Sequence, residues 1–129
     1  MRKLFRVFAL GFVVSWLWES LHSMLYSNYM GLPISGFILF RAALVDAAII
    51  SILIFIGRKF GKYKTLFILS AGFIVAVIIE ILALRTGRWE YNSLMPIIPI
   101  IKTGLTPTIQ LAMTAYLVAL DVKAGKEYK

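Results

Sequence analysis

Ionisable side chains interrupt the apolar stretches of this chain at positions where they could transfer protons. Glu19 and His22 stand three residues apart near the end of the first apolar run, and His22 is the only histidine. Residues at this spacing share one face of a helix, so the carboxyl and the imidazole can share a proton. Asp46 and Glu80, in later apolar runs, offer further carboxyl groups. We therefore predict acid/base chemistry with Glu19, His22, Asp46 and Glu80 as catalytic residues.

The Glu-x-x-His spacing also occurs in metal-binding helices of carboxylate-bridged bundles. Those sites need two such motifs and additional glutamates, whereas this chain has one histidine and no cysteine. Asp46 and Glu80 could complete a mononuclear site. We nevertheless expect no metal and no other cofactor, and we interpret Glu19 and His22 as a proton-sharing pair.

Other polar and aromatic residues are candidates for binding a substrate. Arg41 lies inside the second apolar run, and we expect it to pair with Glu19 or to orient a headgroup, since an unpaired charge in a membrane is costly. Gln110 could hydrogen-bond a carbonyl or a hydroxyl. Aromatic rings can stabilise a developing cation, which adds four candidates: Trp16, Trp18, Trp89 and Tyr26.

The segment "GRWEYNSLMP" (87–96) has two interpretations. Trp89 and Tyr91 fit the aromatic belt at a membrane surface, and Arg88 or Arg85 would then pair with Glu80. Alternatively the segment forms a lid, in which Arg88 binds a headgroup or a phosphate and Trp89 and Tyr91 contact the substrate.

The segment "GLTPTIQ" (104–110) predicts the start of the last helix, with Thr106 as the N-cap and Pro107 as the first helical residue. The free N–H groups of this helix end could face a polar pocket and bind an anionic group. An ordinary capped helix at the membrane surface is the alternative.

The composition indicates the elements that hold these residues. Hydrophobic residues make up 60% of the 129 residues, above the 45–50% typical of soluble domains. Four segments, about 5–26, 35–57, 65–84 and 105–122, approach the roughly 20 apolar residues that span a membrane. We predict an all-α integral membrane protein, a single domain (1–129) with a four-helix transmembrane bundle. Because Pro96 and Pro99 prevent a regular helix, the segment before the fourth helix should be irregular or re-entrant.

The basic residues predict the orientation of these spans. Ten lie at the N-terminus, in the 58–64 loop and in the C-terminal tail: Arg2, Lys3, Arg6, Arg58, Lys59, Lys62, Lys64, Lys123, Lys126 and Lys129. Three lie in the 85–104 connection. The positive-inside rule then places both termini in the cytoplasm of a multi-pass cell-membrane protein. The net charge of +8 is explained by this topology and by anionic lipid, so we expect no nucleic-acid partner.

The intramembrane polar residues all fall in the middle or the outer half of the predicted spans. This asymmetry predicts a polar pocket that is reached from the outer face. The alternative is that these groups hold helices together, helped by small residues such as Ala47 and Gly72.

The stretches "WE", "RAALVD", "GRWEYNSLMP" and "GLTPTIQ" resemble a pattern in small four-span prokaryotic membrane proteins that have no assigned function. The resemblance covers most of the chain, and it implies the fold but no activity.

Three functions fit the sequence. The first is an enzyme that acts by acid/base chemistry on a lipid or isoprenoid-like substrate within the bilayer. The second is a transporter or binding protein for a lipid or small molecule. The third is an accessory subunit of a membrane complex, in which a polar stripe along the first span would pair with a partner helix; its residues are Ser15, Glu19, His22, Ser23 and Tyr26. A homo-oligomer is compatible with the first two.

Overall fold

The computed structural model describes the backbone of residues 1–127 and the side chains of residues 1–123. It is mostly helical, with four long helices: α1 (Arg2–His22), α2 (Gly36–Gly57), α3 (Lys64–Arg85) and α4 (Leu105–Glu127). A short 3₁₀ helix, η1 (Ser23–Leu25), follows α1, and η2 (Arg58–Tyr63) joins α2 to α3. Lys129 and the side chain of Lys126, both counted in the predicted topology, lie outside the described residues.

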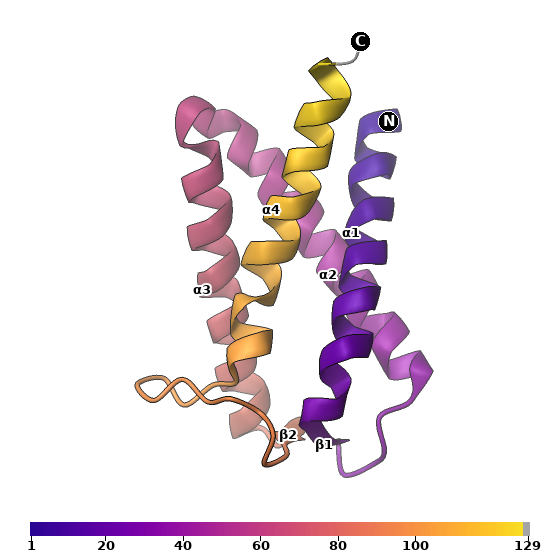
Figure 1. Ribbon diagram of the computed structural model, residues 1–129, viewed down its shortest axis with the longest axis vertical. Helices are drawn as coiled ribbons and strands as arrows, with labels where there is room; N and C mark the ends of the chain where they lie inside the picture. Colours follow the sequence, from indigo (N-terminus) through magenta and orange to yellow (C-terminus); the bar gives the residue numbers. More distant parts are fainter. Residues whose placement is uncertain (128–129) are drawn as a thin grey trace.

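Three helical stretches among the described residues are long and apolar enough to cross a membrane: Arg2–Leu25, Gly36–Arg85 and Leu105–Lys123. The middle stretch contains both α2 and α3. Its connection η2 is not helical throughout, because Gly61 has φ 52° and ψ −120°. α2 and α3 run in opposite directions from this turn (Figure 1). The all-α prediction is confirmed, and the apolar stretches indicate a membrane protein.

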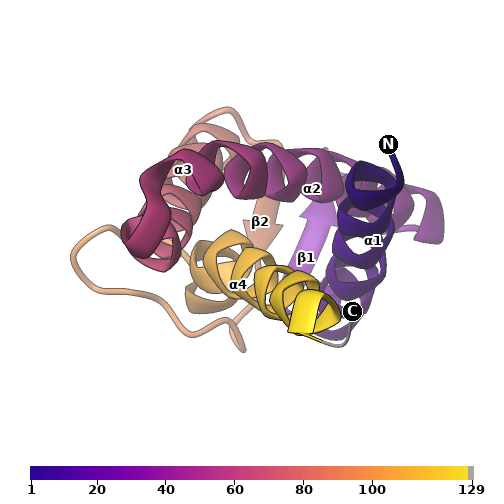
Figure 2. The same cartoon turned by 90° about the horizontal axis from the view of Figure 1, so that it is seen from above.

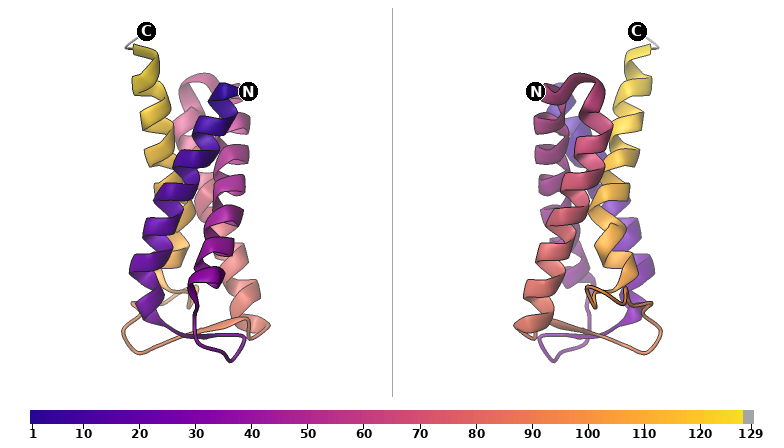
Figure 3. Two further views of the ribbon diagram at one scale, coloured as in Figure 1. Left: turned by 90° about the vertical axis from the view of Figure 1, so that its right-hand side faces the viewer. Right: turned by 90° about the vertical axis from the view of Figure 1, so that its left-hand side faces the viewer.

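The helices run lengthwise through the molecule, with different structures at its two ends (Figures 1 and 3). Both chain termini and η2 lie at one end, here called the terminal end. The small sheet and the long connections lie at the other, here called the sheet end. Seen from above, α1, α2, α3 and α4 surround a common centre (Figure 2).

Apolar side chains fill the terminal half of the bundle. The largest fully buried ones include Val7 of α1, Ile54 of α2, Ile68 of α3 and Val118 of α4. α3 and α4 also approach closely, since a Cβ on Gly72 would lie 2.9 Å from the Cα of Ala112. This half therefore has the close packing that small residues allow between membrane helices.

A two-stranded antiparallel sheet forms between connections that are distant in the sequence. Strand β1 (Tyr26–Tyr29) pairs with β2 (Trp89–Tyr91), with Tyr29 opposite Trp89 and Tyr26 opposite Tyr91. This sheet was not predicted. The first helix was expected to continue to Tyr26, but α1 ends at His22 and η1 turns the chain into β1.

The connection from β2 to α4 is irregular and lies at the sheet end (Figure 1). It folds back on itself, because the Ile98 N–H donates to the Thr103 carbonyl and the Leu105 N–H donates to the Pro96 carbonyl. The fourth helix begins at Leu105, so Pro107 is its third residue rather than its first.

Candidate functional site

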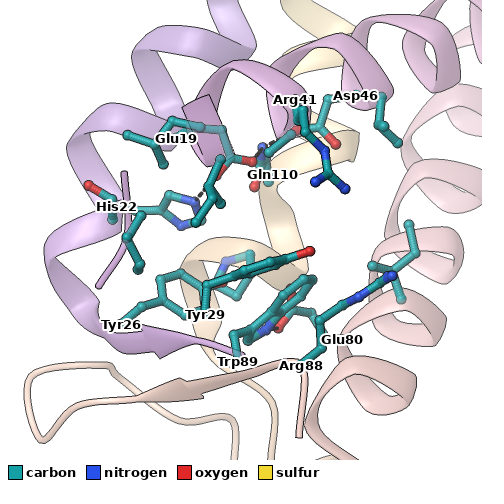
Figure 4. Close-up of a pocket in the computed structure, with 18 of the residues that line it drawn as sticks. Glu19, His22, Tyr26, Tyr29, Arg41, Asp46, Glu80, Arg88, Trp89 and Gln110 are labelled. Carbon is teal, nitrogen blue, oxygen red and sulfur yellow. Dashed lines mark hydrogen bonds and ion pairs between the residues drawn. The ribbon is translucent and has the colours of Figure 1, made fainter. Parts of the chain in front are cut away.

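A cavity of about 320 Å³ lies between the four helices at the sheet end. The sheet forms one wall and the helices form the others (Figure 4). Nine residues singled out from the sequence as catalytic or substrate-binding line it: Glu19, His22, Tyr26, Arg41, Asp46, Glu80, Arg88, Trp89 and Gln110. The structure thus brings together side chains from all four helices and from β2.

Glu19 lies at the centre of a hydrogen-bonded chain that connects α1, α2 and α4. One oxygen, Oε2, is 3.0 Å from Nε2 of His22, and the other, Oε1, accepts a 2.7 Å hydrogen bond from Nε2 of Gln110. The same Gln110 nitrogen donates to Oδ2 of Asp46 at 2.5 Å. His22 Nδ1 lies 3.1 Å from Oγ1 of Thr106. A proton could therefore pass directly between the imidazole of His22 and the carboxyl group of Glu19, while Gln110 holds the carboxyl group of Asp46 beside them.

This arrangement replaces the ion pair expected between Glu19 and Arg41. Among the described residues, the ion pairs are Arg6–Asp121 and Glu19–His22. His22 is one turn from Glu19 on the same helix face, and Gln110 approaches from the first turns of α4. These neighbours occupy both oxygens of Glu19.

Glu80 is also hydrogen-bonded differently from the prediction. Its Oε2 accepts hydrogen bonds from Nε1 of Trp89 at 3.2 Å and from the hydroxyl of Tyr91 at 2.5 Å, instead of pairing with Arg85 or Arg88. The glycine-led turn after α3 brings β2 back over the helix end, because Gly87 has φ 67°. The two aromatic donors thereby reach a carboxyl group that is 5% exposed.

Tyr91 joins three elements but does not line the cavity. Its hydroxyl donates to Glu80 of α3 and accepts a 3.0 Å hydrogen bond from the N–H of Gly104, just before α4. Burial, followed by the hydrogen bond to Glu80, raises the pKa of Tyr91 above its usual range. Tyr91 is therefore a neutral donor that links β2 to α3 and to the residue before α4, and it lies behind the cavity wall rather than in it.

Like Trp18, Trp16 was predicted to contact the substrate but lies outside the cavity. Its ring lies between α1 and α2, with its centroid 5.7 Å from that of Phe12 and 5.8 Å from that of Phe40. The contact with Phe40 is edge-to-face. The aromatic wall of the cavity is instead made by Trp89, Tyr26 and Tyr29, of which Tyr29 was not predicted.

Tyr26 and Tyr29 reach the cavity because β1 pairs with β2. Tyr29 stacks on Trp89, with ring centroids 6.2 Å apart and an interplanar angle of 26°. Burial raises the pKa of the Tyr26 phenol above its usual range, so this group also stays neutral. The four residues of β1, "YSNY", show no hydrophobic alternation that would predict a strand. Their pairing with residues 89–91 could not be predicted from the local sequence.

The N-terminal end of α4 offers few N–H groups to an anion. The Gly104 N–H donates to Tyr91, the Leu105 N–H donates to Pro96, and Pro107 has no N–H. Pro107 lines the cavity with its ring. Fewer N–H groups of this helix end are therefore left to bind an anion than the sequence suggested.

Two guanidinium groups enter the cavity from different walls. Arg41 extends from α2 and Arg88 from the turn before β2 (Figure 4). Within the described part of the chain, neither side chain forms a hydrogen bond or an ion pair; Arg41 lies 6.0 Å from the ring centroid of Phe37. Both residues are exposed.

Among the described residues there is no cluster of three or more histidine, aspartate or glutamate side chains arranged to hold a metal ion. Comparisons of the chain with protein-family models, with curated proteins and with solved structures found no match.

Proposed function

We propose that the chain is a cell-membrane protein with four transmembrane helices, α1 to α4, and with its sheet end facing outward. The length of each helix supports this proposal, since about 20 residues cross the bilayer core. The basic residues of η2 and of the start of α1 share the terminal end. The positive-inside rule then places the termini in the cytoplasm and the cavity in the outer half of the membrane.

We further propose that the cavity is the active site of an enzyme that acts on a lipid or isoprenoid-like substrate. The observation that carries this proposal is the composition of its walls. Glu19, His22 and Asp46 form one hydrogen-bonded group through Gln110. The remaining wall is largely apolar, with Ile34, Ile38, Leu39, Ala42, Val45, Ala76, Ile79 and Leu111. A proton-transferring group beside an apolar wall suits a substrate with a hydrocarbon chain.

The simplest reaction for this geometry is the movement of a double bond. The Glu19–His22 pair donates a proton to one alkene carbon, and the π electrons form the new C–H bond. Asp46 then removes a proton from a carbon next to the cationic centre, and that C–H electron pair forms the shifted double bond. The faces of Trp89 and Tyr26 would stabilise the cation. Asp46 then releases its proton to solvent as the product leaves, and the Glu19–His22 pair takes one up, so the cycle consumes no net proton and no cofactor.

The apolar core distinguishes this proposal from transport. A transport pathway needs polar groups on both sides of the membrane, whereas Val7, Ile54, Ile68 and Val118 fill the terminal half. An accessory subunit would present its polar stripe to another chain. Here Glu19 and His22 of that stripe face the cavity and hydrogen-bond to residues of α4.

The test is conversion of lipid by the purified protein in proteoliposomes made from a total lipid extract of the source cells. Mass spectrometry before and after incubation should show one species lost and an isomer or cyclised product gained. Since general acid/base groups contribute about 10²–10⁴-fold, Glu19→Gln and Asp46→Asn should each lower the rate by at least about 100-fold. Asp121→Asn, which alters an exposed carboxyl group far from the cavity, is the control. Equal lipid profiles with wild type and with Glu19→Gln would refute an enzymatic role.

A further inference from the structure

The carboxyl groups of the cavity have hydrogen-bond partners, whereas its two arginines have none among the described residues. Glu19 and Asp46 accept hydrogen bonds from Gln110, and Glu80 accepts them from Trp89 and Tyr91. The guanidinium groups of Arg41 and Arg88 have no such partners among the described residues. Each guanidinium has five N–H donors and no acceptor. The N–H donors left without a partner on these two side chains are therefore cationic.

A third unused donor lies near these two. The Tyr29 side chain extends into the cavity between Arg41 and Arg88 (Figure 4). Its ring is fixed by stacking on Trp89, and within the described residues its hydroxyl forms no hydrogen bond. Three donors thus converge from three segments: α2, the turn before β2, and β1.

We infer that the ligand of this cavity carries a phosphate group, held by Arg41, Arg88 and Tyr29. Guanidinium groups bind phosphate oxygens in bidentate fashion, and they do so more strongly than neutral donors. Donors that approach from separate directions suit a tetrahedral anion better than a flat carboxylate. The carboxyl groups of the cavity already accept hydrogen bonds from other donors, and none of them forms an ion pair with Arg41 or Arg88 within the described part of the chain.

The position of this donor group indicates that the phosphate is attached to an apolar chain. Arg41 is five residues into α2, roughly 7.5 Å along the helix from Gly36 at 1.5 Å per residue, which is close to the depth of lipid headgroups. Val45, one turn further, lines the cavity and is 58% exposed, so the cavity reaches the lipid-facing surface of α2. A hydrocarbon chain can pass there while the phosphate stays with the arginines.

This inference rests on the proposed function, since it names the substrate class of the same cavity, but its test does not depend on turnover. The purified protein is mixed in mild detergent with a polyprenyl monophosphate, with the polyprenyl alcohol of the same chain length, or with inorganic phosphate. Native mass spectrometry then measures binding. We expect one molecule of the polyprenyl monophosphate to bind per chain. The alcohol and inorganic phosphate should each bind at least ten-fold more weakly.

Matched variants locate the binding site. Arg41→Gln and Arg88→Gln should each weaken binding of the polyprenyl phosphate at least ten-fold, and Tyr29→Phe should weaken it about three-fold. Arg85→Gln, an exposed arginine at the end of α3 that does not line the cavity, should have no effect. Size-exclusion profiles check that the variants fold. Arg41→Lys and Arg88→Lys keep the charge without the bidentate geometry and should show an intermediate loss.

Two results would overturn the inference: equal binding of the alcohol and the phosphate, or unchanged binding in both arginine-to-glutamine variants. If inorganic phosphate binds as tightly as the polyprenyl phosphate, the hydrocarbon chain contributes nothing to binding, and the inference of an apolar chain is refuted. Glu19→Gln separates the two proposals, because it should abolish conversion and leave phosphate binding intact. If Glu19→Gln converts lipid normally while the arginine variants lose binding, the phosphate site stands and the acid/base role fails.

Discussion

The hydroxyl of Tyr91 should contribute far more to stability than the hydroxyl of Tyr29, although both residues belong to the same two-stranded sheet. Tyr91→Phe removes a hydrogen bond to the carboxyl group of Glu80 and leaves the buried N–H of Gly104 without its acceptor. A hydrogen bond contributes about 0.5–1.5 kcal/mol net, and an unsatisfied buried group costs about 1–3 kcal/mol. Because Trp89 still donates to Glu80, we expect a loss of about 2–4 kcal/mol.

Tyr29→Phe is the matched control, since its ring keeps the stacking on Trp89 and its hydroxyl has no partner in the described part of the chain. We expect its free energy of unfolding to change by less than about 0.5 kcal/mol. The assay is equilibrium unfolding in mixed micelles by a denaturing detergent, followed by the fluorescence of the three tryptophans. Equal stability of the two variants would show that the Glu80–Tyr91–Gly104 contacts do not hold the sheet end together.

Three further predictions concern packing, surface charge and pH. Gly72→Val should prevent stable folding or lower the free energy of unfolding by more than about 3 kcal/mol in the same assay. The reason is that a Cβ at this position would lie 2.9 Å from the backbone of Ala112. A variant as stable as wild type would show that α3 and α4 are not in close contact. Arg6→Gln should lower the free energy of unfolding by less than about 1 kcal/mol, because its ion pair with Asp121 is about half exposed. A larger loss would contradict a surface ion pair. The pKa of Tyr91 is raised in the folded protein. Above about pH 10 the unfolded chain therefore loses this phenolic proton while the folded protein keeps it. Stability should therefore be independent of this group below that pH and fall above it, with a smaller fall in Tyr91→Phe; an equal fall in both proteins would contradict the shift.

The helices and the polar end of the bundle could be predicted because they depend on local composition. Apolar runs of about 20 residues fix where helices form, and the positions of Glu19, Asp46 and Gln110 along their helices place them at a similar depth. Their partners could not be predicted in the same way. Whether Glu19 contacts Arg41 or Gln110 depends on how the helices rotate about their axes, which is set by packing across the whole bundle.

The sheet was missed for a different physical reason. Its strands have four and three residues and lie in connections about sixty residues apart, so no local period indicates them. The sheet nevertheless determines which aromatic residues reach the cavity. It brings in Tyr26 and Tyr29 and uses Tyr91 as a tie to Glu80, while Trp16 packs on the side of α1 with Phe12 and Phe40.

The central claim is that the sheet-end cavity holds an amphiphilic molecule, and the most direct measurement is native mass spectrometry of the protein purified from its source membrane without added lipid. We predict one retained lipid species per chain, which extraction and fragmentation identify as a phosphate carried on a hydrocarbon chain. The same species should be absent from the Arg41→Gln, Arg88→Gln double variant and present in Arg85→Gln. A wild-type protein without any retained lipid, or a double variant that retains the same lipid, would contradict the account.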